Sequence, residues 1–321
     1  MELTHLSELN YQELRYERFD YLITTCGYQP RCHYLADNVH FNATGKFMLT
    51  IDETGNGEDR CKHMDILTKH GFKSYKASVD ETQSVEKLLG DLCNQTHDHL
   101  NILIDYSCMP KKWYAAILDN ITRNNFRSKN INIFLSYTPK IFEKKRPTLS
   151  ARYFGPMVEE KDKLRHKKPI TLIAALDTNG HLLQEAVNLI KPANLLAFVP
   201  NCRYDPDYTA AVLLSNKALL AKADGKNIHS YDVSHPDALN ALLTSCCLDL
   251  RLESEILILP QGPKIFSMMA LLLSVRYPDI KLWELTFKNG KSVSEQGLPA
   301  SAPVVIKASF LDDEEDAWDD E

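Results

Sequence analysis

The order of strand-like and helix-like segments repeats twice along this chain, and that repetition most constrains its fold. In residues 1–139 short apolar runs alternate with helical stretches, and residues 169–310 repeat the same order. Such alternation is typical of parallel strands joined by right-handed helical crossovers. The sequence therefore predicts an α/β fold of two Rossmann-like halves, each a doubly wound parallel sheet.

The periodicity of apolar residues, together with the Gly and Pro residues between apolar segments, predicts the bounds of the individual strands and helices. The strands predicted in the first half are 21–26, 46–51, 74–79, 101–106 and 132–137, and its helices are about 31–39, 59–70, 82–94 and 112–123. The strands predicted in the second half are 170–176, 195–199, 227–233, 255–259 and 281–287, and its helices are 181–190, 206–223, 236–252 and 264–276. An edge strand is predicted at 304–308.

The fourth units of the two halves match each other best. "ILIDYSCMPKKWYAAIL" (102–118) and "ILILPQGPKIFSMMALL" (256–272) each run from an apolar strand through a short loop into Pro-Lys and an apolar helix. Proline suits a helix start because its missing N–H is not needed there. The match indicates an old duplication, or two generic β/α units that converged.

Two segments stand apart by charge. Residues 140–168 are rich in charged side chains and are predicted to be a linker, with a covering hairpin or a basic surface segment as alternatives. Residues 312–321 hold eight carboxylates, so the net charge of -6 becomes -6 + 8 = +2 for the rest of the chain. The acidic tail, 311–321, is either a solvated tail or a partner-binding motif in which Trp318 anchors in a basic groove.

The composition of the chain limits where in the cell the protein is expected and which partners it can bind. No run approaches the roughly 20 apolar residues of a membrane span, and the first 20 residues lack a signal-peptide core. The eight cysteines show no disulfide-framework spacing, so we expect a cytoplasmic protein with reduced thiols and no membrane partner. The near-neutral body carries no nucleic-acid reading motif, and direct duplex binding is not expected.

A zinc site would have to draw on a set of five residues that contains no C-x2-C pair: Cys26, Cys32, His33, Cys61 and His63. The sequence also lacks the G-x-G-x-x-G and Walker fingerprints of bound nucleotides. It therefore predicts no metal and no resident cofactor.

Ligands of open parallel sheets bind beyond the carboxyl ends of the strands. The first such loop lies in "TTCGYQPRCHYLADN" (24–38), where Gly27 and Tyr28 precede Arg31 at a helix start. Gly27 would allow close backbone approach, and Arg31 could form a bidentate contact with a phosphate or carboxylate. The loop is either an anion site or only a tight strand-to-helix corner.

The loops of the two matching units carry the other candidate residues. Asp105, Ser107 and Lys111 follow one strand, while Gln261, Gly262 and Lys264 follow its counterpart. A lysine at a helix start opposes the helix dipole, which indicates a nearby anion unless the side chain simply extends to water. Ser107 could instead cap its helix.

The loop after residues 170–176 begins with Asp177, which completes the predicted ligand set. Cys26 or Cys108 could also be a thiol nucleophile, paired with His33 or His235. The alternative is that both cysteines are buried and only structural.

The unit "EILILPQGPKIFSMMALLLSVRYPDIKLW" (255–283) resembles the CRISPR-associated Rossmann-fold (CARF) sensors and related prokaryotic defence proteins. The resemblance implies a Rossmann-like sensor, usually dimeric, that binds a cyclic oligonucleotide and in some members degrades it. It would place Gln261, Gly262 and Lys264 on the pocket rim, with Gly27 and Arg31 on the corresponding first loop. The chain has Pro-Gln-Gly-Pro-Lys where a Gly/Thr-rich turn is usual, and no effector domain follows.

Three functions remain open at this stage. The first is a ligand-sensing or regulatory component of prokaryotic antiviral defence, which binds a nucleotide-type anion and signals to a partner protein; a homodimer is also expected as an alternative to the monomer. The second is an enzyme on a nucleotide or nucleoside, with Asp105 as general base or nucleophile and the lysines stabilising developing charge. The third is a non-catalytic scaffold that binds through its acidic tail.

Overall fold

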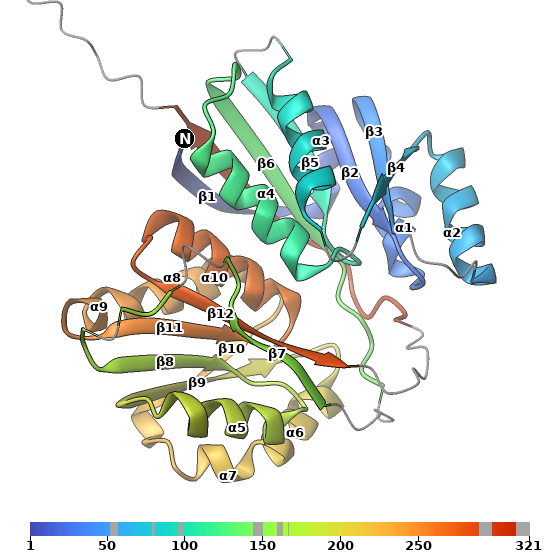
Figure 1. The fold of residues 1–321 in the computed structure, drawn as a ribbon. Helices are drawn as coiled ribbons and strands as arrows, with labels where there is room; N and C mark the ends of the chain where they lie inside the picture. Colours follow the sequence, from blue (N-terminus) through green and yellow to red (C-terminus); the bar gives the residue numbers. More distant parts are fainter. Residues whose placement is uncertain are drawn as a thin grey trace, which may run out of the picture.

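The computed structural model describes residues 1–51, 57–78, 81–95, 99–143, 150–158, 163–165, 167–288 and 297–312. The chain forms two α/β halves that pack against each other (Figure 1). Trp318 and the rest of the acidic tail beyond Asp312 lie outside the described residues, as do parts of the predicted linker.

The first half is built on a seven-stranded mixed sheet, in the order β1-β13-β6-β5-β2-β3-β4. Its elements are β1 (Glu2–Asn10), the 3-10 helix η1 (Tyr11–Tyr16), β2 (Arg18–Cys26), α1 (Arg31–Asn38), β3 (Asn42–Ile51), α2 (Glu58–Lys69), β4 (Lys73–Ala77), α3 (Gln83–Cys93), β5 (His99–Asp105), α4 (Lys111–Arg123), β6 (Asn130–Tyr137) and β13 (Val304–Leu311). Strands β2 to β6 are parallel to one another, and the central strand β5 is apolar because both of its faces are covered.

The second half is built on a six-stranded mixed sheet, in the order β10-β9-β8-β11-β12-β7. Its elements are β7 (Ser150–Pro156), β8 (Ile170–Ala175), α5 (Gly180–Ile190), β9 (Asn194–Asn201), α6 (Pro206–Ser215), α7 (Lys217–Leu220), the 3-10 helix η2 (Gly225–Asn227), β10 (Ile228–Asp232), α8 (Pro236–Leu248), α9 (Leu250–Glu253), β11 (Glu255–Pro260), α10 (Lys264–Arg276) and β12 (Lys281–Lys288). Strands β8 to β12 are parallel to one another.

The five parallel strands have the same spatial order in both halves. Numbered along the chain within each half, they lie in the order 3-2-1-4-5, which is the order of the classical doubly wound fold. The predicted fold class of two Rossmann-like halves is confirmed.

Three antiparallel strands differ from the predicted organisation. Strand β13, predicted as an edge strand near the end of the second half, crosses back and pairs with β6 of the first sheet. Strand β1, which was not predicted, pairs with β13 and completes that edge. Strand β7 lies within the predicted linker and pairs with β12 of the second sheet. Both sheets are therefore mixed instead of wholly parallel.

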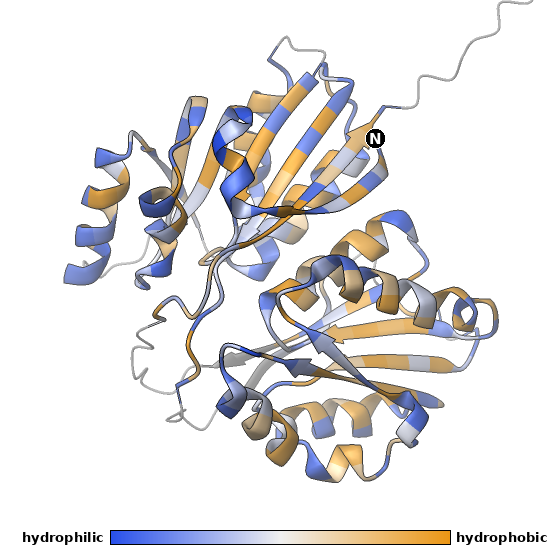
Figure 2. Cartoon of the chain, turned by 180° about the vertical axis from the view of Figure 1, so that it is seen from behind, coloured by the Kyte–Doolittle hydropathy of each residue, from blue (hydrophilic) through white to orange (hydrophobic). Residues whose placement is uncertain are grey.

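Helix α10 joins the two halves into one packed body. Ten of its thirteen residues, Ile265 to Ser274, are buried, because α10 contacts α8, β11 and β12 of its own half and also α4 and β1 of the other. Figure 2 shows the apolar colouring that continues through the helices between the sheets. The helix is apolar nearly all round because it serves as core for both halves.

Candidate functional site

The order of the parallel strands reverses direction at one point in each sheet, between β2 and β5 in the first and between β8 and β11 in the second. Ligand crevices of doubly wound folds lie outside the carboxyl ends of the strands at such points. The four loops there hold every residue of the predicted ligand set, and the two crevices face each other across the contact between the halves.

Two lysines cross that contact in opposite directions. Lys264 Nζ, at the start of α10, donates hydrogen bonds to the carbonyl oxygens of Tyr106 (3.2 Å), Ser107 (2.9 Å) and Met109 (2.5 Å). Lys111 Nζ, at the start of α4, donates to Pro260 O at 2.7 Å. Each lysine thus donates hydrogen bonds to carbonyl oxygens in the opposite half. The sequence had suggested either a nearby anion or a side chain that extends to water, and neither of these includes this role.

Burial lowers the pKa of Lys264 to about 7, and the positive charges of Arg31 and Lys111 act in the same direction. Burial also lowers the pKa of Lys111, against the opposing charges of Glu284 and Asp177. The three hydrogen bonds from Lys264 Nζ to carbonyl oxygens favour the charged form of the lysine. They oppose burial, which favours the neutral form.

A cleft of about 230 Å³ opens beside the Lys264 contact. Both halves and the segment that leaves β6 contribute to its wall. The lining residues are Arg31, Tyr137, Lys140, Phe142, Asp177, Cys202, Tyr204, Asp205, Tyr208, Gln261, Gly262, Pro263 and Lys264.

Arg31 is a positively charged residue that the first half contributes to the wall of the cleft. Only 5% of its surface is exposed, yet the structure gives it no carboxylate partner among the described residues. Its Nε donates to Gln29 Oε1 at 2.8 Å, and its Nη1 donates to Thr138 O at 3.2 Å. These two bonds fix the guanidinium with donor capacity left toward the cleft, since the group carries five N–H donors.

Gln261 is the clearest unsatisfied group in the wall. Its side chain is 8% exposed, and its Nε2 atom is buried with no hydrogen-bond partner within the described structure. A buried amide without a partner costs about 1–3 kcal/mol. The amide lies in the loop that begins α10, where backbone N–H groups and the helix dipole favour an anion.

Gly262 lies in a tightly packed part of the cleft wall. A Cβ at this position would lie 2.9 Å from Tyr231 Oη and 3.1 Å from Leu176 O. The first contact is shorter than real Cβ atoms make, and the second is tighter than most of them. A glycine therefore suits the loop between β11 and α10, which passes close to β8 and β10.

Aromatic rings form the opposite wall. The rings of Phe142 and Tyr208 lie 5.4 Å apart with a tilt of 60°, and Tyr137 and Tyr204 also line the cleft. Asp205 holds this wall in place, since its carboxylate accepts hydrogen bonds from Phe142 N (2.7 Å) and Tyr208 N (3.2 Å).

Sequence reasoning missed the aromatic wall. The rule for the carboxyl ends of strands also applies to the loop after β9, but its tyrosines were not singled out. The position of Phe142 could not be predicted from the sequence.

Five residues of the predicted set line the cleft, and five do not. Arg31, Asp177, Gln261, Gly262 and Lys264 are in its wall. The residues outside it are Gly27, Tyr28, Asp105, Ser107 and Lys111.

Asp105 and Ser107 form a closed pair. Ser107 donates to Asp105 Oδ1 from its backbone N (2.9 Å) and its hydroxyl (2.5 Å), and Ser107 Oγ accepts from Thr138 N at 2.8 Å. Burial raises the pKa of Asp105 to about 6, although the bonds from Ser107 and the charges of Arg31 and Lys264 act in the opposite direction. The pair holds the loop after β5 against the end of β6.

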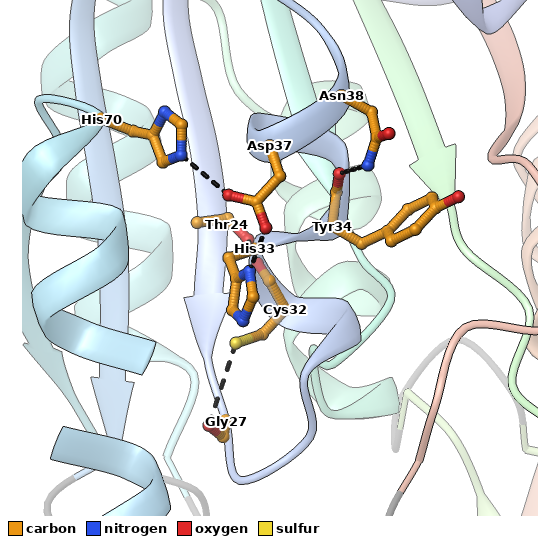
Figure 3. Close-up of polar contacts among 8 residues, drawn as sticks. All are labelled: Thr24, Gly27, Cys32, His33, Tyr34, Asp37, Asn38 and His70. Carbon is orange, nitrogen blue, oxygen red and sulfur yellow. Dashed lines mark hydrogen bonds and ion pairs between the residues drawn. The ribbon is translucent and has the colours of Figure 1, made fainter. Parts of the chain in front are cut away.

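Gly27 belongs to a packed corner. Figure 3 shows Cys32 directed toward the carbonyl oxygen of Gly27, 3.9 Å away, with His33 and Asp37 on the outer side of α1. His63 Nδ1 lies 3.1 Å from the same oxygen. Arg31, four residues further on, is the part of this loop that reaches the cleft.

Among the described residues no group of three or more His, Cys, Asp or Glu side chains could hold a metal ion. No helix within those residues is both long enough and apolar enough to cross a membrane.

No protein-family model matches this chain, nor does any curated protein. Solved structures do match it at low identity. The cytoplasmic domain of a prokaryotic cation chloride cotransporter is 10% identical, covers 84% of this chain and 95% of its own, and has a TM-score of 0.26. A protein described as a sarcosine dimethylglycine methyltransferase, from Galdieria sulphuraria, is 11% identical, covers 92% of this chain and 79% of its own, and also has a TM-score of 0.26.

Proposed function

We propose that this protein is a ligand-sensing component that binds a small nucleotide-type anion in the cleft between its halves and passes the bound state to a partner protein. The observation that carries the proposal is the buried, unpartnered amide nitrogen of Gln261 in the wall of that cleft. A ligand acceptor would satisfy this group, and native proteins rarely leave such a group unpaired.

The anionic end of the ligand would lie between Arg31 and the start of α10. Arg31 is fixed by Gln29 and Thr138, so it would lose little conformational entropy on binding. Helix α10 contributes backbone N–H groups without a side-chain cap. This pairing of a fixed guanidinium with a helix N-terminus is well suited to phosphate.

The base and sugar would lie toward the aromatic wall. Tyr204, Tyr208 and Phe142 offer faces on which a base can stack, at about 1–3 kcal/mol per base. Asp177 offers carboxylate oxygens for hydroxyl groups of a ribose, beyond the bonds that it accepts from Asn179.

The volume of the cleft narrows the class of ligand. At about 230 Å³ it is slightly below the usual range of small-molecule sites, roughly 300–1,000 Å³. A mononucleotide-sized ligand fits this volume better than the cyclic oligonucleotide that the CARF resemblance implied. The role in antiviral defence stays a prediction.

The enzyme hypothesis gains no support from the position of Asp105. Its carboxylate is bonded to Ser107 and does not line the cleft, so it is not placed to act on a ligand bound there.

Binding can be tested with a panel of mononucleotides, dinucleotides and cyclic nucleotides, with thermal unfolding of the full chain as readout. A ligand that binds only the folded state stabilises it by RT ln(1 + [L]/Kd), so Tm rises with the logarithm of the ligand concentration once that concentration exceeds Kd. For the best ligand we expect Gln261→Leu to weaken binding about tenfold or more, because an unmade hydrogen bond at a buried site costs about 1–3 kcal/mol. Arg31→Met should abolish binding.

Matched controls are Gln83→Leu, at an exposed position on α3, and Arg276→Met, at the exposed end of α10. Both should bind as the unmodified protein does. If no member of the panel shifts Tm, or if the Gln83 and Gln261 variants bind equally well, the proposal is wrong.

A further inference from the structure

Four cysteines gather at the carboxyl end of β2 in the first half, outside the cleft. Cys26 ends β2 and Cys32 lies in the first turn of α1, and both are buried. Cys108 is partly exposed in the loop between β5 and α4, and Cys61 is exposed on α2. The proposed ligand makes no use of these thiols.

Cys32 and Cys108 approach Gly27 from two sides. Cys32 Sγ lies 3.9 Å from Gly27 O (Figure 3). On the other side, a Cβ placed on Gly27 would lie 3.2 Å from Cys108 Cβ and 3.7 Å from its Sγ. The absence of a side chain at Gly27 therefore makes room for Cys108 beside Cys32, and the two thiols share a hydrogen bond.

The surroundings make the two thiols unequal. The hydrogen bond from Cys32, together with the charges of Arg31 and Lys264, lowers the pKa of Cys108, against the effect of burial. The same hydrogen bond and burial raise the pKa of Cys32. A partly exposed thiol with a lowered pKa beside a buried thiol is the arrangement of an attacking and a resolving cysteine.

We propose that Cys32 and Cys108 are a redox site, which a hydroperoxide converts to a reversible disulfide. The Cys108 thiolate attacks the peroxide O–O bond, which gives a sulfenic acid at Cys108 and releases the alcohol, or water from hydrogen peroxide. The Cys32 sulfur then loses its proton and displaces the hydroxyl of the sulfenic acid, which leaves as water. In sum, two thiols and one hydroperoxide give one disulfide, one water and one alcohol.

This disulfide would link the first turn of α1 to the loop of residues 106–110. The same loop offers Lys264 its three carbonyl oxygens, and Arg31 lies directly before Cys32. Oxidation would therefore act on the contact between the halves. The disulfide itself does not depend on what the cleft binds.

The test treats the reduced full chain with one to a few equivalents of hydrogen peroxide, blocks the remaining thiols with N-ethylmaleimide, and maps peptides by mass spectrometry. We expect the loss of two alkylatable thiols and a linked peptide pair that contains Cys32 and Cys108, reversed by dithiothreitol. Cys61→Ser and Cys26→Ser should retain the link. Cys32→Ser should replace it with sulfenic or sulfinic acid at Cys108.

Mapping of the unmodified protein decides the matter even where a variant fails to fold. A link between Cys26 and Cys108 would overturn the proposal. So would oxidation of Cys61 while Cys32 and Cys108 both remain alkylatable.

Discussion

Lys111 and Lys264 occupy equivalent positions in the two halves, and each donates hydrogen bonds to the loop that precedes the other. Lys111 reaches Pro260 O, whereas Lys264 reaches three carbonyl oxygens between Tyr106 and Met109. The two fourth units, which are the most similar in sequence, are thus also the two that meet. This exchange fixes the two crevices face to face and leaves the cleft to one side of it.

Lys264→Met should destabilise the protein more than Lys111→Met. The first change leaves three carbonyl oxygens without the ammonium, and the second leaves one. With about 1–3 kcal/mol for a buried acceptor left unsatisfied, we expect losses of about 2 kcal/mol for Lys264→Met and about 1 kcal/mol for Lys111→Met in the free energy of unfolding by urea.

The matched control is Lys112→Met, at an exposed position next to Lys111. It should change the free energy of unfolding by less than about 0.5 kcal/mol. Equal losses for the Lys112 and Lys264 variants would show that the carbonyl contacts do not stabilise the contact between the halves.

Gly262→Ala should strain the wall of the cleft. The added methyl group would lie 2.9 Å from Tyr231 Oη and 3.1 Å from Leu176 O, and the second of these is backbone that cannot turn aside. Overpacking of this kind costs about 1–3 kcal/mol. Thermal unfolding should show a lower Tm for this variant.

Gly90→Ala is the control for Gly262→Ala, since nothing lies within 4 Å of a Cβ there. Gly90 is inside helix α3, so alanine should stabilise the protein by about 0.5–1 kcal/mol. If both variants raise Tm, the contacts with Tyr231 and Leu176 do not exclude a side chain at position 262.

The parallel strands and the helices were predictable because their signal is local. Runs such as Ile102–Ile104 are apolar on both faces, and Gly or Pro marks the loops between them. Strand β1 gave no comparable signal, because "ELTHLSELN" mixes polar and apolar residues and its position depends on β13, about 300 residues away in sequence. Pairing over that distance is decided by packing that no local pattern records.

The candidate site was predictable only in part for the same reason. The loops were located correctly by the rule for carboxyl ends of strands, which is why Arg31 and Gln261 were found. The sequence presents each half separately, however, so it could not show that Lys264 is held by the opposite half. Phe142 was missed because its place depends on where the chain crosses between the halves.

Asp105 should make the protein less stable as pH rises from about 4 to 6. Its pKa is raised from 3.8 to about 6 in the folded state, so the folded protein binds more protons than the unfolded chain in this window and loses stability as they dissociate. At 1.36 kcal/mol per pKa unit the full effect is about 3 kcal/mol.

Asp105→Asn keeps an acceptor for Ser107 and has no charge to bury. Urea unfolding of both proteins between pH 4 and 7 should show the difference in stability shifting in favour of the Asn variant as pH rises. Parallel pH profiles would contradict the assignment of this titration to Asp105.

Lys264 should make anion binding in the cleft weaken as pH rises through about 7. Burial holds its pKa near that value, so the ammonium is charged at pH 6 and largely neutral at pH 8, and one positive charge leaves the wall of the cleft.

The ligand used to test this must itself keep a constant charge, which a cyclic mononucleotide does because its phosphodiester does not titrate in this range. Calorimetric titration should then give a Kd that rises about threefold to tenfold between pH 6 and pH 8, the size expected when one positive charge near the bound anion is lost. Lys264→Arg remains charged throughout and should bind with little dependence on pH. If the unmodified protein and the Arg variant follow the same pH profile, Lys264 is not the titrating group.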